Sequence, residues 1–356
     1  MQLKTLKTLF LVSVAIISLT DSLHAQEAET VEPTLEDQMI SQPASKRDGK
    51  YLTFNLENDA LGGGTDENYT NGARISYHDA NLDIPSWARK LGELYPGFRI
   101  NDTTAVTYSI GQNLYTPRDL TRTIPDPTDR PYAGWLYGSI GLSTVTNNHE
   151  DQLELALGVV GPAALGKQTQ NLVHNHITTG ADDPQGWDSQ LDNEPGLMLS
   201  WGREYPDLWS VNFNDDLYFS VAPSFGATLG NVYTLAQAGI GFRLAPYAER
   251  YADLPARVRP STPGSGYFPK LDDKWSWGFF GGVTGYAVGR NIFLDGNTFE
   301  DSPSVDSKPL VYDASIGFDT IYSNTRFSYT LTRRSKEFEG QENESTFGSF
   351  AVTRRF

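Results

Sequence analysis

The sequence contains no cysteine among its 356 residues, which excludes disulfide bonds and thiolate zinc sites. It is also poor in basic residues: 28 lysines and arginines stand against 44 aspartates and glutamates, and the formal net charge is −16. Because nucleic-acid binding depends on a basic footprint, this balance argues against a nucleic-acid partner. A chain this acidic that binds an anionic ligand needs local arginine or lysine, or a bridging cation.

Sequence motifs of several large enzyme classes are missing as well. There is no Gly-x-Ser-x-Gly elbow, no His-Glu-x-x-His zinc motif, no P-loop and no dinucleotide fingerprint. Only five histidines are present, and one of them, His24, lies in the first 25 residues.

Long apolar runs are absent except at the start of the chain. Two lysines precede an apolar run at residues 9–17, and a small-residue cleavage pattern ends at Ala25. The run is too short for a membrane-spanning helix, which needs about 20 apolar residues. We therefore predict a cleaved signal peptide at residues 1–25, with a membrane anchor as the alternative. Residues 26–49 are polar, acidic and without periodicity, which predicts a flexible leader.

Apolar and polar residues alternate through most of the remaining chain, and aromatic residues make up 12% of the whole sequence. About twelve segments show this alternation, the first through Leu52, Phe54 and Leu56. Strands with one side facing lipid and a polar side facing the lumen are typical of outer-membrane barrels. We therefore predict an all-β fold, a transmembrane antiparallel β-barrel of about twelve strands over residues 50–356. A secreted β-sandwich also alternates, but the signal peptide, the aromatic content and the terminal Phe356 favour the outer membrane of a Gram-negative bacterium.

The strand count also predicts a topology. If the first strand runs outward from the periplasm, the extracellular connections are approximately 58–70, 115–131, 161–195, 225–231, 289–307 and 338–344. Two of the periplasmic connections, at about 79–103 and 246–274, are longer than such turns usually are. No strand carries an obviously unusual polar stripe on its lipid-facing side, so the sequence does not determine the oligomeric state, and a monomer is the default expectation.

The longest extracellular connection, 161–195, holds the most promising titratable group. Residues 165–176 lack alternation and can form about three helical turns, with Gln170 and His174 as i and i+4 neighbours on one face. A histidine in this place could act as a general base. The alternative is that His174 and His176 are ordinary solvated loop residues.

Polar side chains gather at the outer ends of the neighbouring hairpins. Asn58 and Asp59 begin the first connection, Thr70 ends it, and Arg122 lies in the second. Carboxylate and amide oxygens suit calcium, with Asp59 as the best single ligand, and arginine suits phosphate. Asparagine and aspartate are also ordinary turn residues. Composition alone leaves an enzyme and a passive barrel equally open.

An ordered set of motifs over roughly residues 50–200 resembles the lipid A 3'-O-deacylase family of Gram-negative outer membranes. The motifs are Asn58-Asp59, Tyr69-Thr70-x-Gly72, Gly111-Gln112-x-Leu114-Tyr115-x-Pro117, Asp129-Arg130-Pro131-Tyr132-Ala133-Gly134-Trp135, Gly161-Pro162-x-Ala164-x-Gly166-x(3)-Gln170-Asn171-x(2)-His174 and Gly186-Trp187-x(2)-Gln190-Leu191. Six spaced motifs in register are far more specific than any one alone.

The resemblance implies a twelve-stranded barrel that hydrolyses the ester at the 3' position of lipid A in the outer leaflet. It also implies calcium dependence and release of the 3'-linked acyloxyacyl group. By motif, His174 would activate water, while Asn58, Thr70 and Gln170 would line the site. Asp59 would lie near the calcium, with Asn58 as a further ligand.

Two positions depart from the family pattern. The family has a lysine where Arg122 stands, at a position that contacts the ester or phosphate region. A family glutamate that follows the histidine has no clean match, since Gly180 falls near it and two aspartates follow.

The substrate also predicts where the site must lie. Lipid A and lipopolysaccharide reside in the membrane, so the site should be at the lipid-facing rim of the barrel. Asn58 shares the lipid-facing parity of Leu56, whereas Thr70 shares the lumen-facing parity of Arg74, and a bulge would reconcile the two.

Three other functions stay open. An outer-membrane phospholipase would need a serine near a His–Asn pair in a local motif that is missing here. A passive barrel and a catalytically decayed family member are the remaining alternatives.

Overall fold

The structure, a computed structural model, describes residues 33–41, 49–62, 68–95, 97–176, 184–213, 216–246, 258, 266–270 and 275–356. Within these ranges, the side chains of residues 68 and 173–176 are not described. The predicted signal peptide at residues 1–25 lies outside the described residues and stays a prediction.

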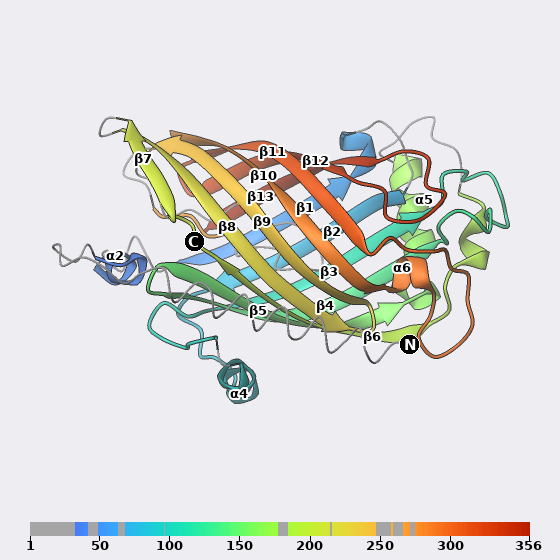
Figure 1. Cartoon of the computed structure of the whole chain (residues 1–356), viewed down its shortest axis with the longest axis horizontal. Helices are drawn as coiled ribbons and strands as arrows, with labels where there is room; N and C mark the ends of the chain where they lie inside the picture. The colour runs from blue at the N-terminus through green and yellow to red at the C-terminus, as the bar shows by residue number, and fades with distance from the viewer. Residues whose placement is uncertain are drawn as a thin grey trace.

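The chain forms a closed antiparallel barrel, which confirms the predicted fold (Figure 1). Neighbouring strands pair in the order of the sequence, β1 pairs with β13, and β6 pairs with β8 to close the barrel. The strands are β1 (Lys50–Asn58), β2 (Asn68–Asp79), β3 (Ala105–Thr116), β4 (Ala133–Thr146), β5 (His149–Val160), β6 (Glu194–Glu204), β7 (Trp209–Phe213), β8 (Leu217–Gly230), β9 (Tyr233–Pro246), β10 (Trp275–Asn291), β11 (Leu310–Tyr322), β12 (Thr325–Arg334) and β13 (Ser345–Arg355).

Twelve of these strands make the closed wall, and β7 is an extension of β6. Glu204 of β6 pairs with Ser224 of β8, and Trp209 of β7 then pairs with Val221 further along the same strand. The sequence prediction contained every strand except β7. It was wrong about the connection at 225–231, because β8 runs to Gly230 and β9 begins at Tyr233.

Alternation of side chains produces the two faces of the wall. In β1, Leu52 and Phe54 are exposed on the outside, whereas Thr53 and Asn55 are buried on the lumen side. The alternation continues in the other strands of the wall, and several buried charges in the lumen form ion pairs. Asp319, for example, lies between the guanidinium groups of Arg243 and Arg326.

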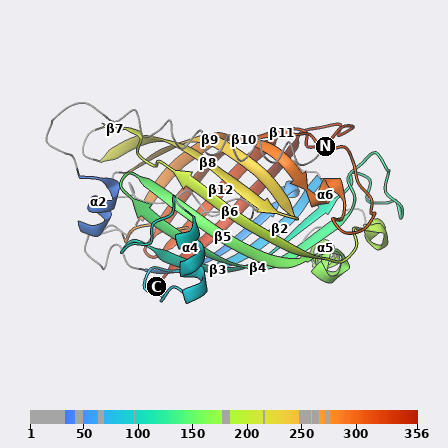
Figure 2. The same cartoon turned by 60° about the horizontal axis from the view of Figure 1, so that its bottom comes forward.

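Short helices lie at both ends of the barrel, and the two ends are named after them here (Figures 1 and 2). The α5 end carries α5 (Gly166–His176) and α6 (Ile292–Asp295), and the α4 end carries α2 (Leu35–Ser41) and α4 (Ser86–Leu94). None of the helices in the described ranges is long and apolar enough to cross a membrane.

Helix α2 lies within residues 26–49, where the sequence predicts a flexible leader. Thr34 and Asp37 cap it reciprocally, since each backbone N–H donates to the other side chain at 3.1 Å. Glu36 then accepts a hydrogen bond from the backbone of Asn147 at 2.8 Å, which fixes the helix to the turn between β4 and β5.

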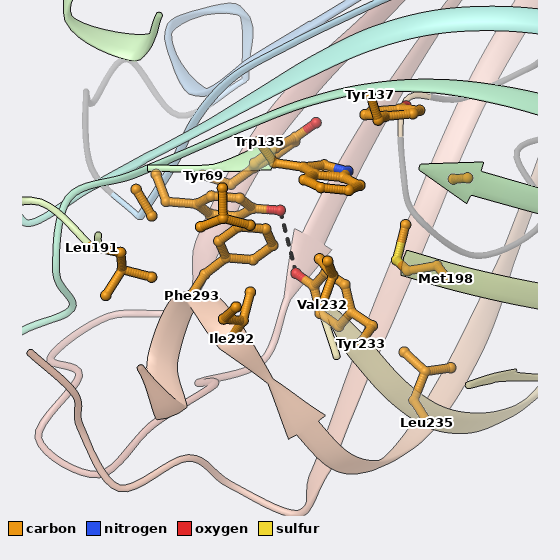
Figure 3. Packing of buried hydrophobic residues seen from close by; sticks show 14 of the residues in the cluster. Tyr69, Trp135, Tyr137, Leu191, Met198, Val232, Tyr233, Leu235, Ile292 and Phe293 are labelled. Carbon is orange, nitrogen blue, oxygen red and sulfur yellow. Dashed lines mark hydrogen bonds between the residues drawn. The ribbon is translucent and has the colours of Figure 1, made fainter. Parts of the chain in front are cut away.

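The lumen is filled with side chains at the α5 end. Tyr69, Trp135, Met198 and Tyr233 from four strands pack there around Phe293 of α6 (Figure 3). Such a layer leaves no wide channel at this level, unlike the lumen of a large porin.

The described residues of the connection between β9 and β10 contact lumen-facing side chains. The backbone N–H of Val258 donates to Glu57 at 3.3 Å, and the Tyr137 hydroxyl donates to the Val258 carbonyl at 3.4 Å. Phe268 lies near the other end of the barrel, where its carbonyl accepts from the Tyr51 hydroxyl at 2.8 Å. The sequence predicts an unusually long periplasmic connection at 246–274, and the structure places two of its described residues, Val258 and Phe268, against side chains that face the lumen.

Candidate active site

The candidate site begins where β1 ends, at Asn58. Its side-chain amide donates to the carbonyl of Thr70 at 2.7 Å, and its Oδ1 accepts from the N–H of Ala60 at 2.8 Å. The second bond caps η1 (Asp59–Leu61), the short turn that follows the strand. Asp59 is 3% exposed, and its Oδ1 accepts from the same N–H at 2.8 Å. Oxygens of Asn58 and Asp59 therefore converge at one point.

A β-bulge turns Thr70 toward the same place. In the pairing of β2 with β3, Tyr69 lies opposite Tyr115 and Asn71 opposite Leu114, so that Thr70 is the extra residue. Its hydroxyl is hydrogen-bonded to that of Thr116 at 2.5 Å. The structure thus contains the bulge that the sequence argument requires.

Helix α5 lies on the outer wall of the barrel. The Gln112 side chain on β3 donates to the carbonyl of Ala164, just before the helix, at 2.6 Å. Gln112, Leu114 and Thr116 alternate along β3 on its outer face, opposite the lumen-facing Tyr115. Because Thr70 contacts Thr116, the end of β1, the bulge and α5 share one outer face of the wall.

Gly166 permits the close approach of α5 to the wall. A Cβ atom at this position would lie 2.5 Å from the ring of Trp187 and 3.2 Å from Leu114. Trp187 belongs to η3 (Gly186–Ser189) and is fully buried, with its ring centroid 5.0 Å from that of Tyr132. The tryptophan therefore has little room to move.

We expect Gly166→Ala to loosen α5 while the barrel stays folded. Overpacking a buried contact typically costs about 1–3 kcal/mol of stability. Here this cost should weaken the docking of α5 on the wall and leave the stability of the strands unchanged. Limited proteolysis of the connection between β5 and β6 should show faster cleavage, with unchanged heat-modifiable migration. Gly138→Ala is the matched control, since the nearest atom to its added Cβ is 3.8 Å away. Equal protease resistance of both variants would contradict this packing argument.

Gln170 is the buried polar residue of α5. Only 2% of it is exposed, and its Oε1 accepts a hydrogen bond from the Trp187 indole at 2.7 Å. Its Nε2 has no hydrogen-bond partner among the described residues. The indole fixes the orientation of the amide and leaves one buried donor available.

His174 follows Gln170 by one helical turn. The predicted helix is observed, and both residues lie in α5, so the i and i+4 relation expected from sequence is present in the backbone. The side chains of His174 and His176 lie outside the described residues.

Among the described residues, no hydrogen bond or ion pair joins the Arg122 side chain to this group. Its guanidinium is about half exposed and pairs with Asp126 at 3.1 Å. The hydroxyl and backbone N–H of Thr128 donate to Asp126 and hold the pKa of its carboxyl below the usual value. The backbone of this connection does lie beside η3, where the Ser189 hydroxyl donates to the Thr123 carbonyl at 3.0 Å.

The donor set at the end of β1 fits a calcium ion in its chemistry. Asn58 and Asp59 offer an amide oxygen and a carboxylate close together, and hard oxygen ligands are those that calcium prefers. Within the described residues, no three histidine or acidic side chains form a metal-binding cluster. A complete ligand set would therefore need backbone carbonyls, water or residues outside those ranges.

Sequence reasoning missed Thr116 as a member of the group. Its position between two motif residues, Tyr115 and Pro117, could have pointed to it. The contact between Thr116 and Thr70 depends on the bulge, which only the structure shows.

Comparison with known proteins gives a family match over nearly the whole chain. The family model described as outer membrane protein LpxR matches residues 9–356. The structure of LpxR from Salmonella typhimurium is similar with a TM-score of 0.71 and 19% identity, over 86% of this chain and 100% of that chain. No curated protein sequence matches significantly.

Two other barrels are much less similar. The β domain of the Bordetella autotransporter Brka gives a TM-score of 0.36 at 8% identity, over 87% of this chain and 100% of that one. The NanC porin gives 0.32 at 4% identity, over 86% and 100%.

Proposed function

The chain belongs to the outer membrane protein LpxR family, and on that premise we propose that it is a calcium-dependent lipid A 3'-O-deacylase. It resides in the outer membrane. The proposed reaction is hydrolysis of the ester that links the acyloxyacyl group to the 3' position of lipid A in the outer leaflet.

The position of α5 is the observation that carries the proposal. The helix is seated on the outer wall and shares one face with Asn58 and Thr70. A membrane lipid can reach that face by lateral diffusion, whereas the lumen is packed with aromatic side chains at this end. A hydrolase whose substrate is a lipid needs its reactive groups on this side of the wall.

In the proposed mechanism, His174 removes a proton from a water molecule. The water oxygen attacks the ester carbonyl carbon, the bond between that carbon and the 3' oxygen breaks, and His174 returns its proton to the departing sugar oxygen. The products are the free acyloxyacyl acid and a 3' hydroxyl group. The buried Nε2 of Gln170 is the proposed hydrogen-bond donor to the developing oxyanion.

The other proposed residues position the substrate. Asn58 and Thr70 line the site beside the ester. Arg122 is proposed to bind the phosphate region of the lipid, for which its guanidinium would leave its exposed ion-pair partner Asp126. Asp59 and Asn58 would hold calcium, which supplies Lewis-acid stabilisation of negative charge and offsets repulsion between an acidic protein and a phosphorylated lipid.

Assays with two lipid classes test this function against the alternatives. Purified protein with calcium is incubated with lipid A or with vesicles of phosphatidylethanolamine and phosphatidylglycerol, and released acyl groups are identified by mass spectrometry. We expect release from lipid A alone. Release from the phospholipids alone would favour a phospholipase, and no release from either by folded protein would favour a passive or decayed barrel.

A further inference from the structure

Helix α4, at the end of the barrel opposite the candidate site, is also packed against the outside of the wall (Figure 2). Its inner face is small: Ala88 is buried, and a Cβ on Gly92 would lie only 3.3 Å from Phe98 and 3.5 Å from Leu142. Leu142 belongs to the apolar outer face of β4, next to Leu153 of β5. The connection that carries α4 therefore covers wall that would otherwise face lipid.

Polar contacts hold the end of this connection in place. Arg203 on β6 donates to the carbonyl of Gly97 at 2.7 Å and forms a bidentate pair with the buried Asp151 at 2.9 Å. The ring of Tyr95 lies 4.8 Å from that of Trp201. The connection is thus fixed by both packing and hydrogen bonds.

The outward flank of α4 carries a stripe that nothing in the described residues covers. Trp87 is 50% exposed and Leu94 is 79% exposed, and they lie seven residues apart on one side of the helix. Lys90 is exposed between them. An aromatic, a basic and an aliphatic side chain in one row are typical of helices that lie in a membrane interface.

The exposed aromatic residues of the wall show where that interface lies. At the α4 end, Trp209, Trp275 and Tyr322 are each more than half exposed at the ends of strands β7, β10 and β11. On the opposite side, the outward-facing Trp201 of β6 is only 8% exposed because Tyr95 covers it. Tyr108 of β3 is 42% exposed on this side. Since aromatic girdles surround outer-membrane barrels at both interfaces, a further aromatic residue is expected beside it.

We propose that α4 is an interfacial helix that binds phospholipid in the leaflet at the α4 end, with Trp87 and Leu94 inserted and Lys90 at the phosphate groups. Trp87 extends the girdle over β3–β6, where Tyr108 of β3 is the large aromatic side chain that the described strands expose near this end. By the predicted topology, this is the periplasmic leaflet. The proposal rests on the outer-membrane location and is independent of the deacylase activity.

The absence of cysteine makes a direct test possible. Leu94→Cys is labelled with bimane and reconstituted into vesicles of phosphatidylethanolamine and phosphatidylglycerol. Quenching is measured with a headgroup spin-labelled phospholipid and with aqueous iodide. Glu93→Cys is the matched control, since Glu93 is adjacent to Leu94 in the helix and its side chain points about 100° away around the axis. Leu157→Cys, on the exposed outer face of β5, serves as the lipid-facing reference.

We expect the lipid quencher to act about twice as strongly at position 94 as at position 93, and iodide to show the opposite order. Equal iodide quenching at both positions would overturn the proposal. Protection from iodide without lipid quenching would overturn it too, because protein would then cover the stripe. Loss of lipid A hydrolysis in any variant leaves this outcome unaffected, since the readout is membrane contact.

Discussion

Replacing His174 by alanine is expected to lower the rate of lipid A deacylation by about 10²–10⁴-fold, the usual contribution of a general base. The side chain starts from a helix that is docked on the outer wall, so its removal should leave the strands unaffected. Heat-modifiable migration should therefore stay that of the wild type. The rate is measured with purified protein and lipid A in detergent.

His176→Ala is the matched control for this prediction. Two residues along an α-helix correspond to a rotation of about 200°, so His176 starts on the far side of α5 from His174. Its replacement should change the rate by less than about threefold if only His174 acts as the base. Full activity of His174→Ala, or equal losses in both variants, would remove His174 from its proposed role.

Replacing Asp59 by alanine is expected to raise the calcium concentration for half-maximal rate by about tenfold or more, because one carboxylate is lost from a site of hard oxygen ligands. Asp59 is buried beside Asn58, and both side chains accept from the N–H of Ala60, so the change removes a proposed ligand whose carboxylate is already oriented. The measurement is a calcium titration of the deacylation rate.

Asp301→Ala controls for general charge at the α5 end, since Asp301 is an exposed acidic residue between β10 and β11. This variant should titrate like the wild type. An unchanged titration for Asp59→Ala would show that Asp59 does not bind the ion. A titration shifted equally in both variants would attribute the effect to surface charge.

The barrel could be predicted because its signal is distributed along the whole sequence. Strand β1 shows the alternation clearly: Leu52 and Phe54 are exposed on the outside of the wall, and Thr53 and Asn55 are buried on the lumen side. The same kind of alternation recurs along the sequence in the other long strands. The same signal was available for β7, where Trp209, Val211 and Phe213 alternate with polar residues, but the segment is only five residues long.

From the sequence, a bulge between Asn58 and Thr70 could be inferred, but its position could not. Parity places Asn58 and Thr70 on opposite faces, and only the register shift between Tyr69 and Asn71 brings both to the outer wall. A bulge changes the pairing of a single residue, which a pattern of alternation over the whole strand does not locate.

Packing that depends on distant segments was beyond sequence reasoning. Leu114 lies on the outer face of β3 and is nevertheless buried, because Trp187 and the start of α5 cover it. Val258 and Phe268 lie in a connection that the strand pattern predicts outside the barrel, yet they contact lumen-facing residues. In both cases the partner is set by tertiary structure, which a local pattern does not encode.

The central claim is that this barrel removes the 3'-linked acyloxyacyl group from lipid A, and tandem mass spectrometry of the lipid product tests it most directly. Lipid A is treated with wild-type protein plus calcium, with wild-type protein plus chelator, and with His174→Ala plus calcium. We predict loss of one acyloxyacyl unit, with fragments that place the loss at the 3' position, in the first sample alone. An unchanged lipid A spectrum in all three samples, from protein shown to be folded, would contradict the account.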